Sequence, residues 1–205
     1  MSLQLFNAQS TPLILDMIDA EVIYYPNFFS IDSSDYFFSK LSTSISWRQD
    51  SIKVFGKTYL QPRETALYGN SNKSYSYSGI TMNPIPFTKE LSEIKAQVEN
   101  TCNVNFTSCL LNLYRDGQDS NGWHADNEKE LGKHPIIASV SFGEERWFHF
   151  KHRYDKTLKQ KIRLQHGSML IMKGKTQEYW LHQIPKTKKI IKPRINLTFR
   201  IIRSN

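Results

Sequence analysis

Apolar residues in the N-terminal half of the chain recur at helical spacing in two places. Residues 88–100 are the clearer case, because an apolar residue returns every third or fourth position while lysine and glutamate fill most positions between. These apolar positions are Leu91, Ile94 and Val98. A shorter helix is expected to begin at Asp32 or Ser33, since both residue types cap helix N-termini. Its apolar side would comprise Phe37, Phe38 and Leu41.

After residue 106 the pattern changes to short alternating runs that are separated by turn residues. The expected strands cover 109–114, 136–142, 146–151, 160–165, 168–173 and 194–202. The expected turns lie at 116–117, 121–122, 143, 166–167 and 174. Many short strands with frequent turns and no alternation with helices predict an antiparallel sandwich or barrel. The fold class is therefore α+β, mostly β, with N-terminal helices followed by a double-stranded β-helix, or jelly roll.

The length of 205 residues suits one domain with a full-sized core. We expect an N-terminal lead-in at residues 1–20 and a single domain at 21–205, with the jelly-roll core at about 106–202. The lead-in offers several apolar residues for docking, namely Leu13, Ile14, Leu15 and Ile18.

The charge balance is basic, with 27 lysines and arginines against 19 acidic residues and a formal net charge of +8. Such a field attracts polyanions, of which nucleic acid and an anionic membrane surface are the common cases. The two cysteines, Cys102 and Cys109, cannot form a disulfide framework, which indicates a reducing compartment. With no signal peptide or membrane-length apolar run in view, we expect a soluble, intracellular protein.

The run Trp123-His124-Ala125-Asp126 is the first candidate for chemistry. On an extended strand, residues two apart share a face, so His124 and Asp126 could bind one metal ion, and His182 is the best third ligand. Two histidines and one carboxylate form the facial triad of non-haem Fe(II) oxygenases. A bare H-x-D also occurs by chance, and a lone histidine is more often structural. The remaining histidines are interpreted as surface or structural, namely His134, His149, His152 and His166.

The C-terminal run 194–201 alternates strictly between polar and apolar residues. Its polar positions are Arg194, Asn196, Thr198 and Arg200. A solvent-exposed sheet would give the same pattern. If this face lines a barrel interior, however, the arginines need a buried anion, and a dicarboxylate such as 2-oxoglutarate suits the arginine fork. Asn112 and Tyr114 share a face of an earlier strand and could add hydrogen bonds.

Taken in order, these motifs resemble the AlkB family of Fe(II)/2-oxoglutarate-dependent nucleic-acid demethylases. The resemblance rests on Asn112-x-Tyr114, His124-x-Asp126, His182 and the string Arg194-Ile195-Asn196-Leu197-Thr198-Phe199-Arg200, and it runs from about residue 24 to 202. It implies that His124, Asp126 and His182 are the catalytic Fe(II) ligands. It implies that Arg194 and Tyr114 hold the distal carboxylate of 2-oxoglutarate, and that Asn112, Asn196 and Arg200 secure the rest. The cofactors would be Fe(II), 2-oxoglutarate and O₂.

The resemblance is closest to the branch that acts on duplex DNA, and it implies a nucleotide-recognition hairpin and lid at about residues 50–80. Phe55, in Val54-Phe55-Gly56-Lys57, would be an intercalating wedge that fills the gap left by a flipped base. Arg63 follows the hairpin. Tyr75, Tyr77 and Ser78 would form the lid. Without the resemblance, Phe55 could belong to the core and the tyrosines to an ordinary polar loop.

Two further segments complete the substrate side. Glu128 matches a position that faces the base, whereas Asn127 stands where relatives often carry an acid. Lys188 and Lys189, with Lys186, would grip the DNA backbone, although Thr187 interrupts the basic run. Such a run is commonly just a solvated surface.

The implied reaction is DNA repair by hydroxylation of N-alkyl groups on bases such as 1-methyladenine and 3-methylcytosine, with release of an aldehyde. The implied partner is DNA, with duplex favoured over single strands or RNA, and no membrane. The chain is expected to act as a monomer, cytoplasmic in a bacterium or nuclear in a eukaryote. The alternatives are a demethylase of RNA or single strands, a non-catalytic nucleic-acid-binding jelly roll, and an oxygenase of proteins or small molecules. The last is disfavoured by the basic charge.

Overall fold

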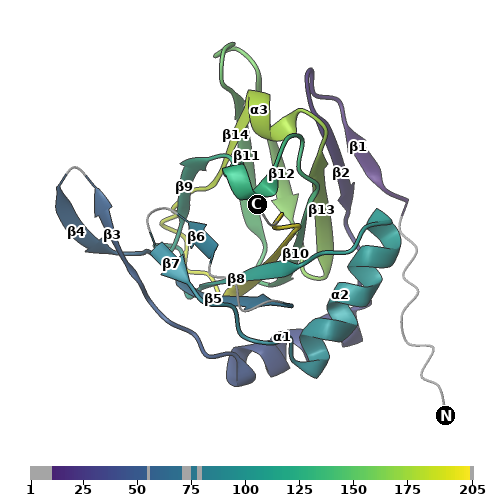
Figure 1. The fold of residues 1–205 in the computed structure, drawn as a ribbon, viewed down its shortest axis with the longest axis vertical. Coiled ribbons are helices and arrows are strands. Elements are labelled where there is room, and N and C mark those ends of the chain that lie inside the picture. The colour runs from purple at the N-terminus through teal and green to yellow at the C-terminus, as the bar shows by residue number, and fades with distance from the viewer. Residues whose placement is uncertain (1–10, 55, 71–74, 78–79, 204–205) are drawn as a thin grey trace.

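The computed structural model describes residues 11–54, 56–70, 75–77 and 80–203. Two antiparallel sheets face each other and form the body of the molecule (Figure 1). The larger sheet has seven strands in the order β1 (Leu13–Leu15), β2 (Glu21–Tyr25), β13 (Ser168–Lys173), β10 (Ile137–Gly143), β15 (Arg194–Arg200), β8 (Ser108–Tyr114) and β5 (Glu64–Gly69). The smaller sheet has four strands in the order β12 (Lys159–Leu164), β11 (Arg146–His152), β14 (Trp180–Ile184) and β9 (Asn121–His124). This confirms the predicted mostly β, jelly-roll fold.

Two short hairpins and three helices complete the described chain. The hairpins are β3 (Ser51–Val54) with β4 (Lys57–Leu60), and β6 (Tyr75–Tyr77) with β7 (Ile80–Met82). The helices are α1 (Ile31–Ser44), α2 (Lys89–Cys102) and the one-turn α3 (Thr176–Tyr179), with a 3₁₀ turn at Lys129–Leu131. The β3–β4 hairpin stands away from the body (Figure 1). No helix among the described residues is long and apolar enough to cross a membrane.

Both predicted helices are present. α2 begins after Thr88, whose side chain accepts a hydrogen bond from the backbone of Leu91, and it ends at Asn103 in a left-handed conformation. The cap of α1 is Ser30, whose hydroxyl accepts from the backbone N–H of Ser33, so the expected start at Asp32 or Ser33 is wrong by two or three positions. Serine at the earlier position already satisfies an otherwise unpaired N–H of the first turn.

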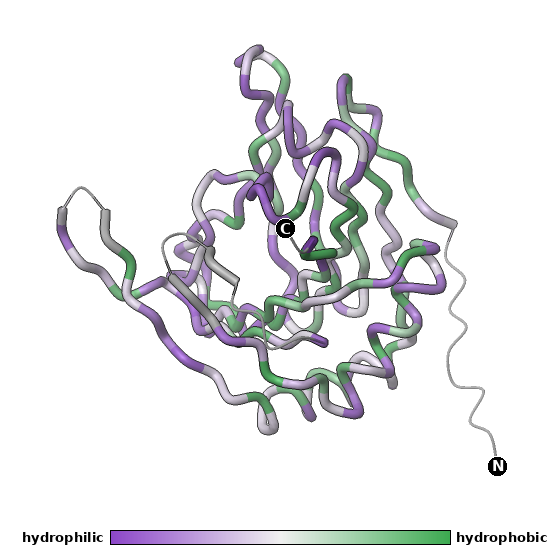
Figure 2. The backbone as a smooth tube through the Cα atoms, in the orientation of Figure 1, coloured by the Kyte–Doolittle hydropathy of each residue, from purple (hydrophilic) through white to green (hydrophobic). Residues whose placement is uncertain are grey.

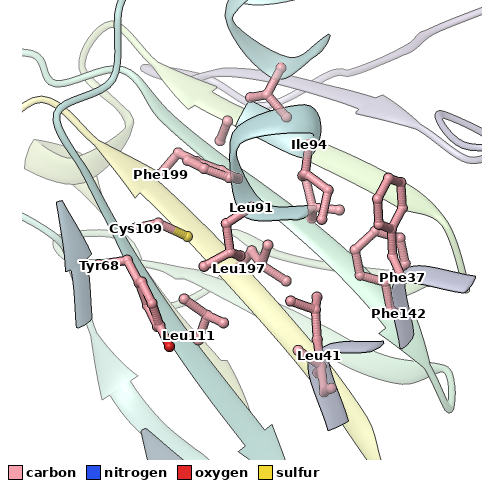
Figure 3. Packing of buried hydrophobic residues seen from close by; sticks show 14 of the residues in the cluster. Phe37, Leu41, Tyr68, Leu91, Ile94, Cys109, Leu111, Phe142, Leu197 and Phe199 are labelled. Atoms are coloured by element: carbon pink, nitrogen blue, oxygen red, sulfur yellow. The ribbon is translucent and has the colours of Figure 1, made fainter. Parts of the chain in front are cut away.

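The helices cover one face of the larger sheet and close the main core. Apolar side chains from α1 and α2 meet those of β5, β8, β10 and β15 in this layer (Figure 3). The labelled members include Phe37, Leu41, Leu91, Ile94, Leu197 and Phe199, all fully buried. Hydrophobic segments accordingly gather along the strands of this sheet (Figure 2). A second apolar cluster lies between the two sheets and includes Phe148, Phe150 and Trp180.

Strand β15 shows how the sheet separates core from site. Ile195, Leu197 and Phe199 belong to the helix-side core, so the intervening polar residues point between the two sheets. All seven residues of this strand are buried. The predicted alternation is therefore confirmed as an interior face and a core face, and the solvent-exposed alternative is excluded.

Part of the expected N-terminal lead-in belongs to the larger sheet. Leu13–Leu15 forms β1, which pairs with β2 at the edge of the larger sheet. The expected docking residues Leu13, Ile14 and Ile18 remain more than half exposed. Backbone pairing, rather than burial of these side chains, holds the segment in place.

Candidate metal centre and cosubstrate pocket

His124, Asp126 and His182 converge between the two sheets. One ligand atom from each lies within 4.8 Å of the others. His124 ends β9 and pairs directly with His182 on the neighbouring strand β14, which places their ring centroids 4.2 Å apart. The antiparallel pairing of β9 with β14 thus brings together two histidines that lie 58 positions apart in the sequence.

Asp126 reaches the site differently from the prediction. β9 ends at His124, so the expected placement of both residues on one strand is wrong. Asp126 lies in the following loop, where its backbone N–H donates to Oε1 of Gln177 at 2.9 Å. This contact replaces a ladder hydrogen bond and fixes the direction of the Asp126 side chain.

Two of the four competing histidines have structural partners. His152 Nδ1 accepts from the backbone N–H groups of Tyr154 and Asp155, and His166 Nδ1 accepts from that of Gly143. His134 lies beside Glu178 at 3.4 Å. None of the four joins a cluster that could hold a metal among the described residues, as expected.

The environment keeps all three converging groups deprotonated at neutral pH. Burial raises the pKa of Asp126, but Arg200 and the two histidines together outweigh it and lower the pKa to about 2. Burial, and then the neighbouring His124, lowers the pKa of His182 to about 3. Burial also lowers the pKa of His124, although Asp126 acts in the opposite direction. Neutral imidazole and ionised carboxylate are the forms that bind metal ions.

Neighbouring groups orient these side chains. Nδ1 of His124 donates to the carbonyl oxygen of Gly122 at 2.7 Å, which fixes the tautomer and makes Nε2 an acceptor. Nε2 lies 3.2 Å from Nδ2 of Asn121 and 3.9 Å from Oδ1 of Asp126. The His182 ring stacks on Phe148 with centroids 5.1 Å apart. Oδ1 of Asp126 is buried without a hydrogen-bond partner, whereas Oδ2 accepts from Arg200 at 2.9 Å. A buried, unsatisfied carboxylate oxygen between two neutral imidazoles fits a divalent metal such as Fe(II).

A single pocket joins this cluster to the polar face of β15. Its lining includes Asn112, Tyr114, His124, Asp126, Ser139, His182, Arg194, Asn196, Thr198 and Arg200. It therefore brings together every residue predicted from the motifs for the metal and for 2-oxoglutarate.

Arg194 is the clearest anion-binding group in the pocket. It is 1% exposed, and no described carboxylate forms an ion pair with it. Nη2 donates to Oγ of Ser141 at 2.8 Å, while Nε and Nη1 are buried without a hydrogen-bond partner among the described residues. Tyr114 lies under the guanidinium, 5.3 Å from Cζ to the ring centroid. Burial lowers the pKa of Arg194 to about 10, so its charge is costly here and a buried carboxylate would offset that cost.

The other predicted cosubstrate residues already have protein partners. Nδ2 of Asn196 donates to Ser139 Oγ and to the Val140 carbonyl. Arg200 donates to Asp126. Oδ1 of Asn112 accepts from Nε of Arg63 at 2.8 Å. These contacts fix the pocket walls before any ligand enters.

The predicted substrate residues are more dispersed. Arg63 is 5% exposed and supports Asn112 inside the protein, so its position does not fit a contact with nucleic acid. Glu128 is half-buried and precedes the 3₁₀ turn. Lys186, Lys188 and Lys189 are exposed on the loop after β14. Phe55 and Ser78 lie outside the described residues, and the backbones of Tyr75 and Tyr77 belong to strand β6.

Sequence reasoning missed Arg146, which is 4% exposed. It donates to the carbonyl oxygens of Asp116, Asp119 and Pro185, and its Cζ lies 5.7 Å from the Tyr114 ring centroid. Tyr114 thus contacts two guanidinium groups. Arg146 begins a strand that contains other basic residues, so nothing in the sequence distinguished it from a surface arginine. Ser139 and Ser141 could have been found, because they alternate with apolar residues within 136–142.

Comparisons with known proteins agree with this geometry. The sequence model described as the 2OG-Fe(II) oxygenase superfamily matches residues 21–200. The chain is 40% identical over 192 residues to alpha-ketoglutarate-dependent dioxygenase alkB homolog 3 of Homo sapiens, covering 89% of this chain and 66% of that protein. It is 36% identical over 188 residues to DNA oxidative demethylase ALKBH2 of Homo sapiens, covering 87% of this chain and 72% of that protein. The chain thus spans just under two thirds of the first relative's length.

The solved structure of OsALKBH1 has a TM-score of 0.66 at 18% identity, covering 93% of this chain and all of that one, which is a likeness of fold. The expected cofactors, Fe(II), 2-oxoglutarate and O₂, are those of the matched superfamily. The family match, the two sets of relatives and the residues that meet in the pocket agree, and the chain belongs to the AlkB family of 2-oxoglutarate- and Fe(II)-dependent oxygenases.

Proposed function

We propose that this chain oxidatively removes N-alkyl groups from nucleic-acid bases. The observation that carries the proposal is one pocket that contains the His124–Asp126–His182 cluster, in which Asp126 and His182 are buried, beside a buried arginine. This arginine, Arg194, has no carboxylate partner among the described residues. The first set suits a metal ion and the second a diacid. Their proximity suits a reaction that uses both.

In this proposal His124, Asp126 and His182 hold Fe(II), and Arg194 with Ser141 and Tyr114 receives the distal carboxylate of 2-oxoglutarate. With O₂, these cofactors would supply the oxidising power to hydroxylate an N-alkyl carbon, after which the N-hydroxyalkyl base breaks down to an aldehyde and the repaired base. The protein's part is to hold the metal ligands deprotonated and the pocket walls fixed.

Arg200 has a role distinct from that of Arg194. Its Nη2 donates to Oδ2 of Asp126, so it orients the carboxylate and leaves Oδ1 for the metal. Arg63 acts one step further out, since it positions Asn112. These contacts support positioning roles for both residues.

Several features support a nucleic-acid substrate. The chain carries a net charge of +8, and its relatives include a protein named as a DNA oxidative demethylase. Alkylation at a Watson–Crick nitrogen, as in 1-methyladenine and 3-methylcytosine, weakens pairing and lowers the cost of extruding the base. Such bases are cationic, and Glu128 lies two residues after Asp126 in the chain.

Duplex DNA is the substrate form we propose, with the β3–β4 hairpin as the element that meets it. This hairpin projects from the body (Figure 1), and Tyr59 and Leu60 on β4 are more than half exposed. Exposed apolar residues on a projecting arm are typical of a binding surface. The basic loop Lys186–Lys189 would contact the backbone. We also propose that the chain acts as a monomer inside the cell, in the cytoplasm of a bacterium or the nucleus of a eukaryote.

The test is turnover with Fe(II), 2-oxoglutarate, ascorbate and oligonucleotides that contain 1-methyladenine, either paired or unpaired. We expect succinate formation coupled to loss of the methyl group, and we expect neither with His182→Ala. Phe55→Ala should reduce activity on the duplex more than on the single strand. Succinate without loss of methyl would point to another substrate, and a complete absence of turnover would support a non-catalytic binding role. Equal losses of activity on the duplex and on the single strand with Phe55→Ala would contradict both the wedge role of Phe55 and the preference for duplex DNA.

A further inference from the structure

The four-stranded sheet has one side toward the metal ligands and one toward solvent. Because side chains alternate along a strand, the neighbours of inward-facing His182, Phe148 and Phe150 point outward. The outward set consists of Trp123 on β9, Trp147, His149 and Lys151 on β11, Lys159, Lys161 and Arg163 on β12, and Leu181 and Gln183 on β14. This set is called the outer face below.

The outer face is basic. Across the β11–β12 ladder, Trp147 stands opposite Arg163, His149 opposite Lys161, and Lys151 opposite Lys159. The set contains four lysines or arginines and no acidic residue. Arg163 is paired with Glu145, at the start of the ladder, at 2.6 Å. The three lysines form no ion pair with any described residue, so their charge is available to an external anion.

The outer face also exposes two tryptophans, Trp123 at 39% and Trp147 at 45%. Each carries a lysine over its ring: Lys151 Nζ lies 4.5 Å from the Trp123 centroid, and Lys161 Nζ lies 5.1 Å from that of Trp147. Burying a tryptophan normally contributes strongly to folding, so two left on a sheet surface indicate a surface that contacts something else. Each ring and its charge lie close enough for one ligand to contact both.

We propose that the outer face binds single-stranded nucleic acid, with bases stacking on Trp147 and Trp123 and phosphates beside the lysines. A basic sheet with exposed aromatic rings combines the two features that such binding uses. A membrane surface fits less well, because inserted rings should project beyond the cations, whereas here the ammonium groups lie over the ring faces.

The position of β9 connects this surface to the pocket. β9 is the edge strand of the smaller sheet, and it carries His124 toward the pocket and Trp123 outward. A nucleic-acid strand bound at the pocket could therefore continue over this edge onto the outer face. The surface would hold a single-stranded segment next to the duplex that contains the reacting base, and its binding does not depend on the chemistry in the pocket.

The test measures binding of a long unmethylated single strand to the full chain by fluorescence anisotropy. Trp147→Ala should weaken binding by at least about fivefold, and Trp147→Tyr should restore most of it because a stacking ring remains. Lys161→Glu should also weaken binding and should reduce the slope of log affinity against log salt by about 0.7 for each phosphate that the variant no longer neutralises. Turnover of a methylated trinucleotide, too short to reach the outer face, should be unchanged in all three variants.

The matched control is the pair Tyr36 and Lys40 on α1. Tyr36 is 45% exposed, as is Trp147, and Lys40 Nζ lies 5.8 Å from its ring. Tyr36→Ala and Lys40→Glu should leave binding unchanged. Wild-type affinity in the Trp147 and Lys161 variants, or equal losses in the control variants, would overturn the proposal. So would Trp147→Ala reducing binding to phosphatidylserine vesicles but not to the strand. If the wild-type chain shows no turnover but still binds the unmethylated strand, the proposed demethylation is wrong and the binding surface is not.

Discussion

Replacing Arg194 with methionine should stabilise the protein without 2-oxoglutarate and abolish its response to that cosubstrate. Arg194 is 1% exposed, donates to Oγ of Ser141, and has no carboxylate partner among the described residues. Replacing buried charged groups by apolar ones of similar volume often leaves stability unchanged or raises it by about 1–4 kcal/mol. Because the guanidinium is uncompensated here, the gain should be at least about 1 kcal/mol, or roughly 2 °C in Tm.

The same replacement should weaken the binding of 2-oxoglutarate. Removing one partner of a buried charge pair costs about 3–5 kcal/mol, which is roughly a 100- to 5,000-fold loss in affinity. At about 100 times its Kd, 2-oxoglutarate should stabilise the wild-type protein by about 2.7 kcal/mol, or roughly 5–11 °C in Tm. At the same concentration the Arg194→Met variant should be stabilised by at most about 0.4 kcal/mol, or roughly 1–2 °C in Tm.

The measurement is thermal denaturation with and without 2-oxoglutarate, with Mn(II) in place of iron and with oxygen excluded. Titration calorimetry then gives the affinity directly. Arg48→Met serves as the control, because Arg48 is an arginine with 48% side-chain exposure that pairs with Asp50 and should affect both quantities little. If Arg194→Met destabilises the ligand-free protein, or if it binds 2-oxoglutarate as wild type does, the buried-anion reasoning is refuted.

Three other changes test the framework around the pocket. Gly143→Ala should cost about 2–4 kcal/mol in urea denaturation, because Gly143 has φ +86° and an added Cβ would lie 2.5 Å from a backbone carbonyl oxygen. Arg63→Met should raise the KM for 2-oxoglutarate roughly five- to tenfold with little change in kcat, because Asn112 loses its donor; an unchanged KM would contradict this. Burial raises the pKa of Asp119, but Arg115 holds it below the usual value, so stability is present above the ordinary pKa and lost as pH falls through the depressed one. Asp119→Asn should therefore cost about 1–2 kcal/mol at pH 7, and the difference in unfolding free energy between the two proteins should shrink as the pH falls below about 4, the ordinary carboxyl pKa.

The C-terminal strand could be predicted in full because two independent signals coincide in it. Its alternation fixes the faces, and the arginines at Arg194 and Arg200 distinguish an anion-binding interior from an ordinary sheet once the fold encloses them. The helix at Lys89–Cys102 was equally accessible, because its apolar stripe and its Thr88 cap are both local features.

Errors arose where tertiary contacts override local patterns. Asp126 departs from strand geometry because Gln177, far along the chain, binds its backbone. Arg63 points inward because Asn112 offers it an acceptor, although the sequence placed it beside a surface hairpin. Strand β14 was not predicted, because the central inward residue of Trp180–Ile184 is the polar His182, while the outward neighbour Leu181 is apolar. In β14 the single inward histidine breaks the apolar–polar alternation, whereas in β15 all the inward residues are polar and the alternation is kept.

The charges of the pocket favour adjoining sites for the proposed metal ion and the proposed cosubstrate. With both histidines neutral, Arg194 and Arg200 contribute two positive charges and Asp126 one negative, so the ionisable lining sums to +1. A divalent metal alone would raise this to +3, and a dianionic diacid alone would lower it to −1. Together they restore the original value in a buried space where uncompensated charge is expensive. Each should therefore strengthen binding of the other, and by thermodynamic linkage the two factors must be equal. Two buried arginines beside the three candidate metal ligands thus favour a pocket that holds both the metal ion and the diacid over one that holds either alone.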